Sequence, residues 1–227
     1  IQTIITALFL FIPFIKKNKI EIDLNIKRNL KTLKDAYKLG IASKAEAMTV
    51  SFIILCTGFF LNQESVGLYN ASYKIYLVLL TIVQGLSYTF MPILLTNLKN
   101  SGEIKLKKIS FVFYIYLITG VLLSILTYLF ADIIILTLFG DKFIDSVSIL
   151  KSFSVTILIW PVLMFMGLVI LAFNKYNYLL ITSVFSAIIS ILFSLILIKS
   201  FGIEGAGYVL PVVAFGSILV SFHFLSI

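Results

Sequence analysis

A single lysine inside a long apolar segment is the side chain best placed for chemistry. Lys74 lies within residues 66–92, an apolar run that exceeds the roughly 20 residues needed to cross a bilayer. Because a cation at this depth costs roughly 2.5–3.5 kcal/mol on insertion scales, we expect Lys74 to face a bundle interior or a wet cavity. There its ammonium group could bind a phosphate or a carboxylate. The alternative is that Lys74 snorkels to the outer membrane surface.

Polar residues recur on the same side of this predicted helix. Positions 70, 74, 81, 85 and 88 are four, seven, four and three residues apart, which places them on one helical face. A polar stripe on a spanning helix indicates a lined cavity. Together with Gln84, which borders it, the stripe adds these candidate substrate-binding residues: Asn70, Thr81 and Tyr88.

Acidic side chains are almost absent from the predicted spans. Glu46, near the inner end of the first span at 44–61, is a further candidate substrate-binding residue. Its alternative role is at a helix interface, where it would help to place the end of the helix. His223 has no carboxylate close in sequence, and Asp132, Asp141 and Asp145 do not have the spacing of a cation loop. We therefore predict no metal site, no cofactor and no catalytic residue.

The composition is that of an integral membrane protein built from helices. Apolar residues make up 60% of the chain and charged residues 12%, and the mean hydropathy is +1.11. Of the 18 Lys and Arg residues, nine lie between positions 16 and 44 and four between 99 and 108. The positive-inside rule places both segments in the cytoplasm, beside anionic lipid headgroups. The basic excess therefore indicates membrane topology and not binding to nucleic acid.

The predicted fold is all-α, a polytopic transmembrane helix bundle with about six full spans and a partial first one. Residues 1–15 are predicted to be the end of a truncated transmembrane helix. Residues 16–39 form a basic cytoplasmic connector, either an amphipathic helix or a solvated linker, and residues 40–227 form the bundle. We expect the chain to be the C-terminal half of a longer transporter. The predicted spans are 44–61, 66–98, 109–130, 147–173, 178–198 and 208–224.

Three stretches resemble one family of membrane transporters. They are GFFLNQESVGLYNASYKI with the later MP at 91 and 92, LFGDKFIDSVSILK, and FGIEGAGYV. In this order and spacing they are similar to the Wzx-type flippases for polysaccharide or O-antigen. That family belongs to the multidrug, oligosaccharidyl-lipid and polysaccharide exporter superfamily. Many of its members carry an acid in the span before the first stretch, whereas residues 49–57 contain none.

The resemblance implies the second bundle of a two-bundle transporter in the bacterial inner membrane. Its substrate would be a polyprenyl-pyrophosphate-linked oligosaccharide for surface polysaccharide, moved to the outer leaflet by alternating access. Lys74, Asn70 and Tyr73 would contact the headgroup or the sugar, and the missing N-terminal half of the chain would be a partner. One alternative is a multidrug exporter, although Lys74 would repel a cationic drug. A membrane-embedded glycan polymerase or transferase is a further alternative, but it would need paired acids or arginines in large outer loops.

Overall fold

The computed structural model describes residues 26–99 and 103–225, and every regular element in them is helical. The predicted helix end at 1–15 and residues 16–25 of the predicted connector lie outside this description. The chain divides into two units, Ile1–Ala36 and Tyr37–Ile227. The elements are α2 (Ile26–Phe60), α3 (Gln63–Lys99), α4 (Glu103–Phe139), η1 (Asp141–Phe143), α5 (Ser146–Ala172), α6 (Tyr176–Phe193), η2 (Ser194–Ile198) and α7 (Lys199–Leu225).

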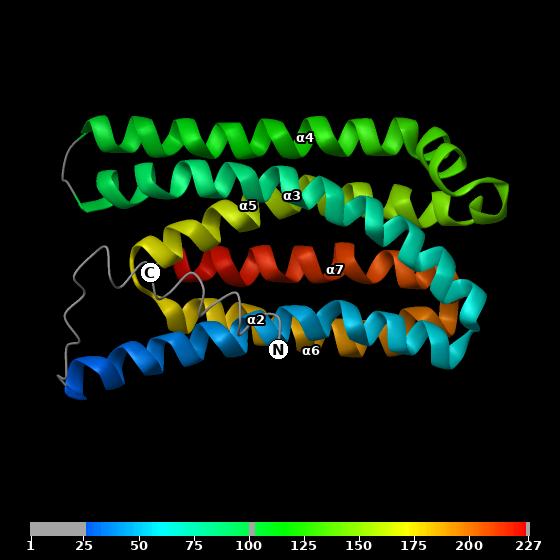
Figure 1. The fold of residues 1–227 in the computed structure, drawn as a ribbon, viewed down its shortest axis with the longest axis horizontal. Helices are drawn as coiled ribbons and strands as arrows, with labels where there is room; N and C mark the ends of the chain where they lie inside the picture. Colours follow the sequence, from blue (N-terminus) through cyan, green and yellow to red (C-terminus); the bar gives the residue numbers. More distant parts are fainter. Residues whose placement is uncertain (1–25, 100–102, 226–227) are drawn as a thin grey trace, which may run out of the picture. The chain divides into compact units, whose positions relative to one another are not determined.

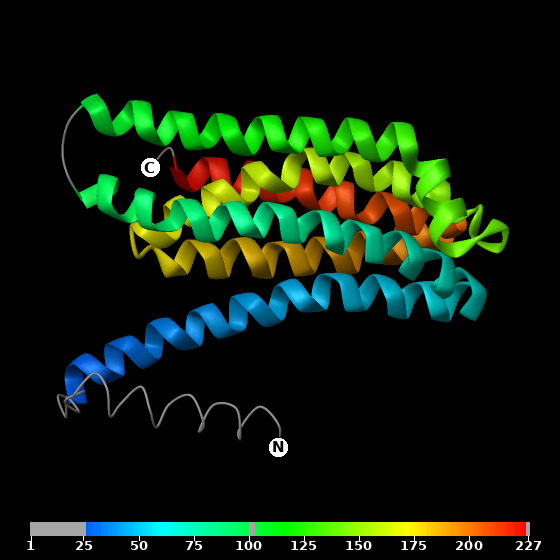
Figure 2. The same cartoon turned by 45° about the horizontal axis from the view of Figure 1, so that its top comes forward.

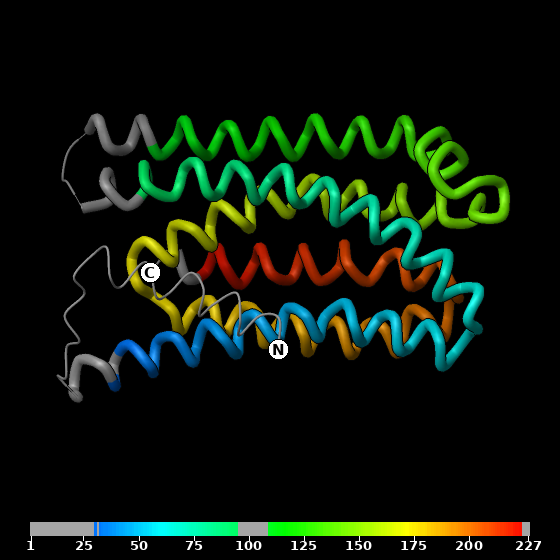
Figure 3. Tube along the Cα trace, in the orientation of Figure 1, coloured from blue at the N-terminus to red at the C-terminus, as the bar shows by residue number. Residues whose placement is uncertain are grey.

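Five helical segments in the described part of the chain are long and apolar enough to cross a membrane. The last of them, 176–223, has 48 residues, about 70 Å at 1.5 Å per residue, which is more than twice the hydrocarbon thickness. It reverses at Gly202, so that α6 and α7 pack side by side (Figures 1 and 3). The protein is therefore a multi-pass membrane protein, and the predicted all-α polytopic bundle is confirmed.

The reversal between α6 and α7 is tighter than expected. The sequence predicts an outer turn over residues 199–207, but Gly202 is the one residue there with non-helical angles (φ 61°, ψ −136°). Only glycine adopts that conformation without strain. Gly205 lies so close to the end of the preceding helix that an added Cβ would overlap the carbonyl oxygen of Leu197. Two glycines thus replace a loop: the chain reverses within the predicted residues, but the turn is shorter than predicted.

Two helices are longer than their charged residues indicate. The sequence predicts the first span at 44–61, whereas the span-length part of α2 covers 32–60. Similarly, α4 runs to Phe139 and includes Asp132, beyond the predicted end of this span at residue 130. Asp132 forms an ion pair with Lys151 of α5 at 2.8 Å. A charged residue is expected to end a span, but ion pairing allows a helix to continue through it.

Within the unit Tyr37–Ile227, helix α5 is the central element. It contacts α3, α4, α6 and α7, and α7 also packs on α6 (Figures 1 and 2). The largest buried cluster lies towards the end of the bundle where α2 turns into α3. Its bulky members are Ile53, Tyr69, Phe153, Ile157 and Leu210. This end of the bundle is therefore closed by packed side chains.

Buried serines join the helices by hydrogen bonds to the backbone. Ser72 of α3 donates to the carbonyl of Ser146 (2.7 Å), and Ser146 of α5 donates back to the carbonyl of Leu68 (2.9 Å). Ser124 of α4 donates to the carbonyl of Ser154 (2.8 Å). Small polar residues allow close helix approach in lipid, and such bonds contribute roughly 0.6–2 kcal/mol each. They hold α3 and α4 against α5.

Candidate functional site: a cavity between five helices

A cavity of about 660 Å³ lies in the unit Tyr37–Ile227, bounded by α2, α3, α5, α6 and α7. On α2 it is lined by residues between 39 and 50, whereas Ile53 and Cys56 of the same helix belong to the packed core. The cavity therefore lies towards the end of the bundle that carries the turn between α5 and α6. Its principal polar and aromatic lining residues are Glu46, Tyr73, Gln84, Trp160, Ser183 and Ser217.

Glu46 is the one charged side chain among the described residues that line this cavity. It accepts a hydrogen bond from the hydroxyl of Ser183 on α6 at 3.2 Å. Helix α2 continues for 14 residues beyond Glu46 to Phe60, or about 21 Å at 1.5 Å per residue. Glu46 therefore lies near the middle of helix α2, and its expected position at the inner end of the membrane span stays a prediction.

Hydroxyl groups from α6 and α7 form another wall of the cavity. Ser186 and Ser217 share a hydrogen bond of 2.7 Å between these two helices. Ser190, further along α6 and outside the lining, donates to the backbone carbonyl of Thr49 on α2 at 2.7 Å. None of these hydroxyl groups is among the site residues predicted from the sequence. The signal was present, because serines recur at 183, 186, 190 and 194, at helical spacing in an otherwise apolar segment.

Aromatic side chains of α3 and α5 complete the lining. Tyr73 and Tyr76 lie with ring centres 5.9 Å apart, and Tyr76 in turn lies 5.6 Å from the ring of Phe153 in the core. Trp160 contributes a second aromatic wall from α5. An apolar, aromatic cavity with a few convergent polar groups is the usual form of a binding site for an amphipathic small molecule.

The structure brings together four of the seven predicted site residues. Glu46, Tyr73, Gln84 and Tyr88 line the cavity. The other three, Asn70, Lys74 and Thr81, are not part of the lining.

Lys74 has an exposed side chain outside this cavity. The side chains of α3 that line the cavity recur from Tyr73 at intervals of three and four residues. Lys74 follows Tyr73 directly, so it is rotated from that face by about 100°. The expectation that Lys74 faces the interior of these helices is thus corrected. Its contact with a substrate stays a prediction.

Among residues 26–99 and 103–225, no group of three or more His, Cys, Asp or Glu side chains is placed to hold a metal ion. The comparisons with known proteins add no assignment, because no protein-family model, curated protein or solved structure matches this chain.

Proposed function

We propose that this chain is the C-terminal bundle of a bacterial inner-membrane flippase that moves a polyprenyl-pyrophosphate-linked oligosaccharide between leaflets. The observation that carries the proposal is the cavity, which combines aromatic walls with hydrogen-bonding groups inside a bundle of span-length helices. A glycan has apolar ring faces, which suit Tyr73 and Trp160. It also has hydroxyl groups, which can donate to Glu46 and to the amide oxygen of Gln84. No covalent chemistry is required.

The position of the cavity suits the direction of transport. The end of α3, the start of α4 and the turn between α5 and α6 lie at the same end of the bundle (Figure 1). If the basic segments 16–44 and 99–108 face the cytoplasm, the cavity opens on the cytoplasmic side and the packed core closes the other side. This is the arrangement that alternating access needs for substrate loading.

The proposal is tested by deleting the gene in its host. We expect the lipid-linked glycan to accumulate in the cytoplasmic leaflet and surface polysaccharide to disappear, with recovery when the full-length gene is supplied. Unchanged surface polysaccharide in the deletion strain would contradict the proposal.

An exporter of organic cations is the second candidate, and one observation favours it. The charged residue in the cavity lining is the acid Glu46, whereas Lys74, which would repel a cation, lies outside. Tyr73 and Trp160 could add cation–π attraction. New sensitivity to cationic drugs in the deletion strain, with normal surface polysaccharide, would support this candidate.

Lys74 is expected to matter less than Glu46 for transport. We expect Lys74→Ala in the full-length protein to lower transport less than Glu46→Ala, because Lys74 lies outside the cavity lining. Lys74→Arg should retain more transport than Lys74→Ala, because it keeps the charge. The assay is surface polysaccharide at matched expression. A complete loss of transport with Lys74→Ala alongside a harmless Glu46→Ala would contradict this order and make Lys74 the more important residue for transport.

A further inference from the structure

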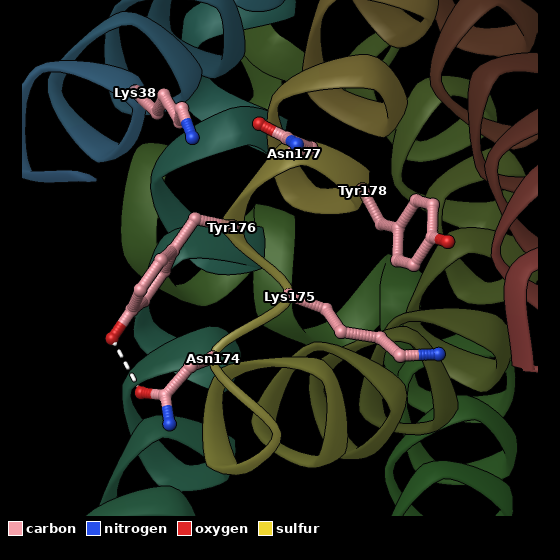
Figure 4. Close-up of a pocket in the computed structure, with 6 residues that line it drawn as sticks. All are labelled: Lys38, Asn174, Lys175, Tyr176, Asn177 and Tyr178. Carbon is pink, nitrogen blue, oxygen red and sulfur yellow. Dashed lines mark hydrogen bonds between the residues drawn. The ribbon is translucent and has the colours of Figure 1, made fainter. Parts of the chain in front are cut away.

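A second, smaller pocket of about 300 Å³ lies at the turn between α5 and α6. The described residues that line it are two lysines, two asparagines and two tyrosines, with no acid among them. The turn joins the spans that end at Ala172 and begin at Tyr176, so the pocket lies at a membrane surface. Its lining residues are Lys38, Asn174, Lys175, Tyr176, Asn177 and Tyr178 (Figure 4).

The turn that forms this pocket has a defined conformation. Asn174 adopts a positive φ of 56°, and its N–H donates to the carbonyl of Leu171 at 2.9 Å. The N–H of Lys175 donates to the carbonyl of Ile170 at 3.1 Å. The hydroxyl of Tyr176 donates to Oδ1 of Asn174 at 2.7 Å, which leaves the amide NH₂ group of Asn174 as a donor. The backbone of the turn is therefore held by its own hydrogen bonds.

The two lysines come from different parts of the chain: Lys38 lies on α2, and Lys175 lies in the turn itself, at the N-cap of α6. Lys175 holds its ammonium group 5.1 Å from the ring centre of Tyr178, within cation–π range. Lys38 extends from α2 towards the start of α6 (Figure 4). Helix α6 begins at Tyr176 without a side-chain cap, so the partial positive charge of its N-terminus adds to that of the two lysines. All three features favour an anion.

We propose that this pocket binds the phosphate group of an anionic membrane lipid. Phosphate oxygens accept hydrogen bonds from lysine and amide donors, and the tyrosines suit the headgroup depth, where aromatic rings concentrate. Basic pockets between transmembrane helices bind such headgroups. This inference goes beyond the transport proposal and does not depend on it.

A bound headgroup would lie beside the mouth of the cavity. Lys38 and Lys175 each precede a cavity residue, Glu46 and Ser183, by eight residues, or about 12 Å along their helices. Leu39 and Leu179, the neighbours of Lys38 and Tyr178, already line the cavity. The pocket thus holds a lipid at the point where a lipid-borne substrate would enter.

The test measures lipid retention by the purified full-length protein. Wild type and the double variant Lys38→Gln, Lys175→Gln are placed in nanodiscs that contain phosphatidylglycerol in a phosphatidylcholine background. Retained phosphatidylglycerol is then counted by native mass spectrometry. We expect the double variant to bind it about 25-fold more weakly, because each of the two basic side chains contributes about a factor of five. Equal retention would overturn the proposal.

Two controls sharpen this experiment. Lys142→Gln, Lys199→Gln removes the same charge from exposed positions outside the pocket and should lower retention much less than the pocket pair does. Lys38→Arg, Lys175→Arg keeps the charge and should retain the lipid, so a general folding defect is separated from loss of the site. The proposal would be overturned if the Lys142→Gln, Lys199→Gln variant lost as much phosphatidylglycerol as the pocket variant. It would also be overturned if the Lys38→Arg, Lys175→Arg variant lost the lipid. Displacement of the lipid by millimolar inorganic phosphate would assign the pocket to free phosphate and overturn the lipid assignment.

Discussion

Glu46→Ala in the full-length protein is expected to lower transport of the lipid-linked oligosaccharide about tenfold to hundredfold. The substitution removes the one charged group among the described residues that line the cavity, and it leaves the hydroxyl of Ser183 without its acceptor. Hydrogen bonds to charged groups contribute roughly 1.5–3 kcal/mol, and the loss of that free energy corresponds to the expected tenfold to hundredfold decrease in transport. Transport is measured as surface polysaccharide in the deletion strain, with each variant at matched expression.

Two further variants separate the candidate roles of this carboxylate. Glu46→Gln keeps an acceptor for Ser183 and for sugar hydroxyls but removes the negative charge. For a glycan we expect it to retain several times more transport than Glu46→Ala. If Glu46→Gln is as inactive as Glu46→Ala, the charge itself is needed, and the exporter of organic cations becomes the better explanation. Glu64→Gln, at an exposed position in the first turn of α3, is the matched control and should behave as wild type.

The fold class could be predicted because apolar segments of span length have few stable forms in lipid. With no water to satisfy the backbone, each such segment forms a helix, whatever its neighbours are. The boundaries failed where charges occur, at the start of the span in α2, which was predicted at Lys44, and at Asp132 in α4. A charge is costly in hydrocarbon, but a cavity with Ser183 or an ion pair with Lys151 allows it within a helix. These partners lie far away in sequence.

The candidate site was predicted only in part, because helical periodicity shows which residues share a face but not where that face points. The stripe through Lys74 and Thr81 is real as a pattern, yet the face of α3 that lines the cavity runs through Tyr73 and Gln84. The deciding information is the packing of α3 against α5. The hydrogen bonds from Ser72 to the carbonyl of Ser146 and from Ser146 to the carbonyl of Leu68 are one part of this packing. No local pattern carries that information.

Gly205→Ala is expected to destabilise the bundle by about 3 kcal/mol or more, and to lower the melting temperature in detergent by about 6–12 °C. An added methyl group would overlap the carbonyl oxygen of Leu197, which belongs to backbone and cannot rotate away as a side chain does. The reversal at Gly202 would therefore have to open, and Val209, Leu210 and the rest of α7 would lose their packing in the core.

Gly85→Ala is the matched control for this prediction, because it adds the same methyl group where the structure has room. No atom lies within 4 Å of a Cβ built at Gly85, which is exposed within helix α3. In a helix interior this change should stabilise by about 0.5–1 kcal/mol, since alanine loses less backbone entropy than glycine. A lower melting temperature for Gly205→Ala and a higher one for Gly85→Ala would show that the close approach of Gly205 to Leu197 holds α6 and α7 together. If Gly205→Ala has the same melting temperature as wild type, the packing of α7 does not depend on the close approach of Gly205 to Leu197. The reversal would then tolerate a looser turn.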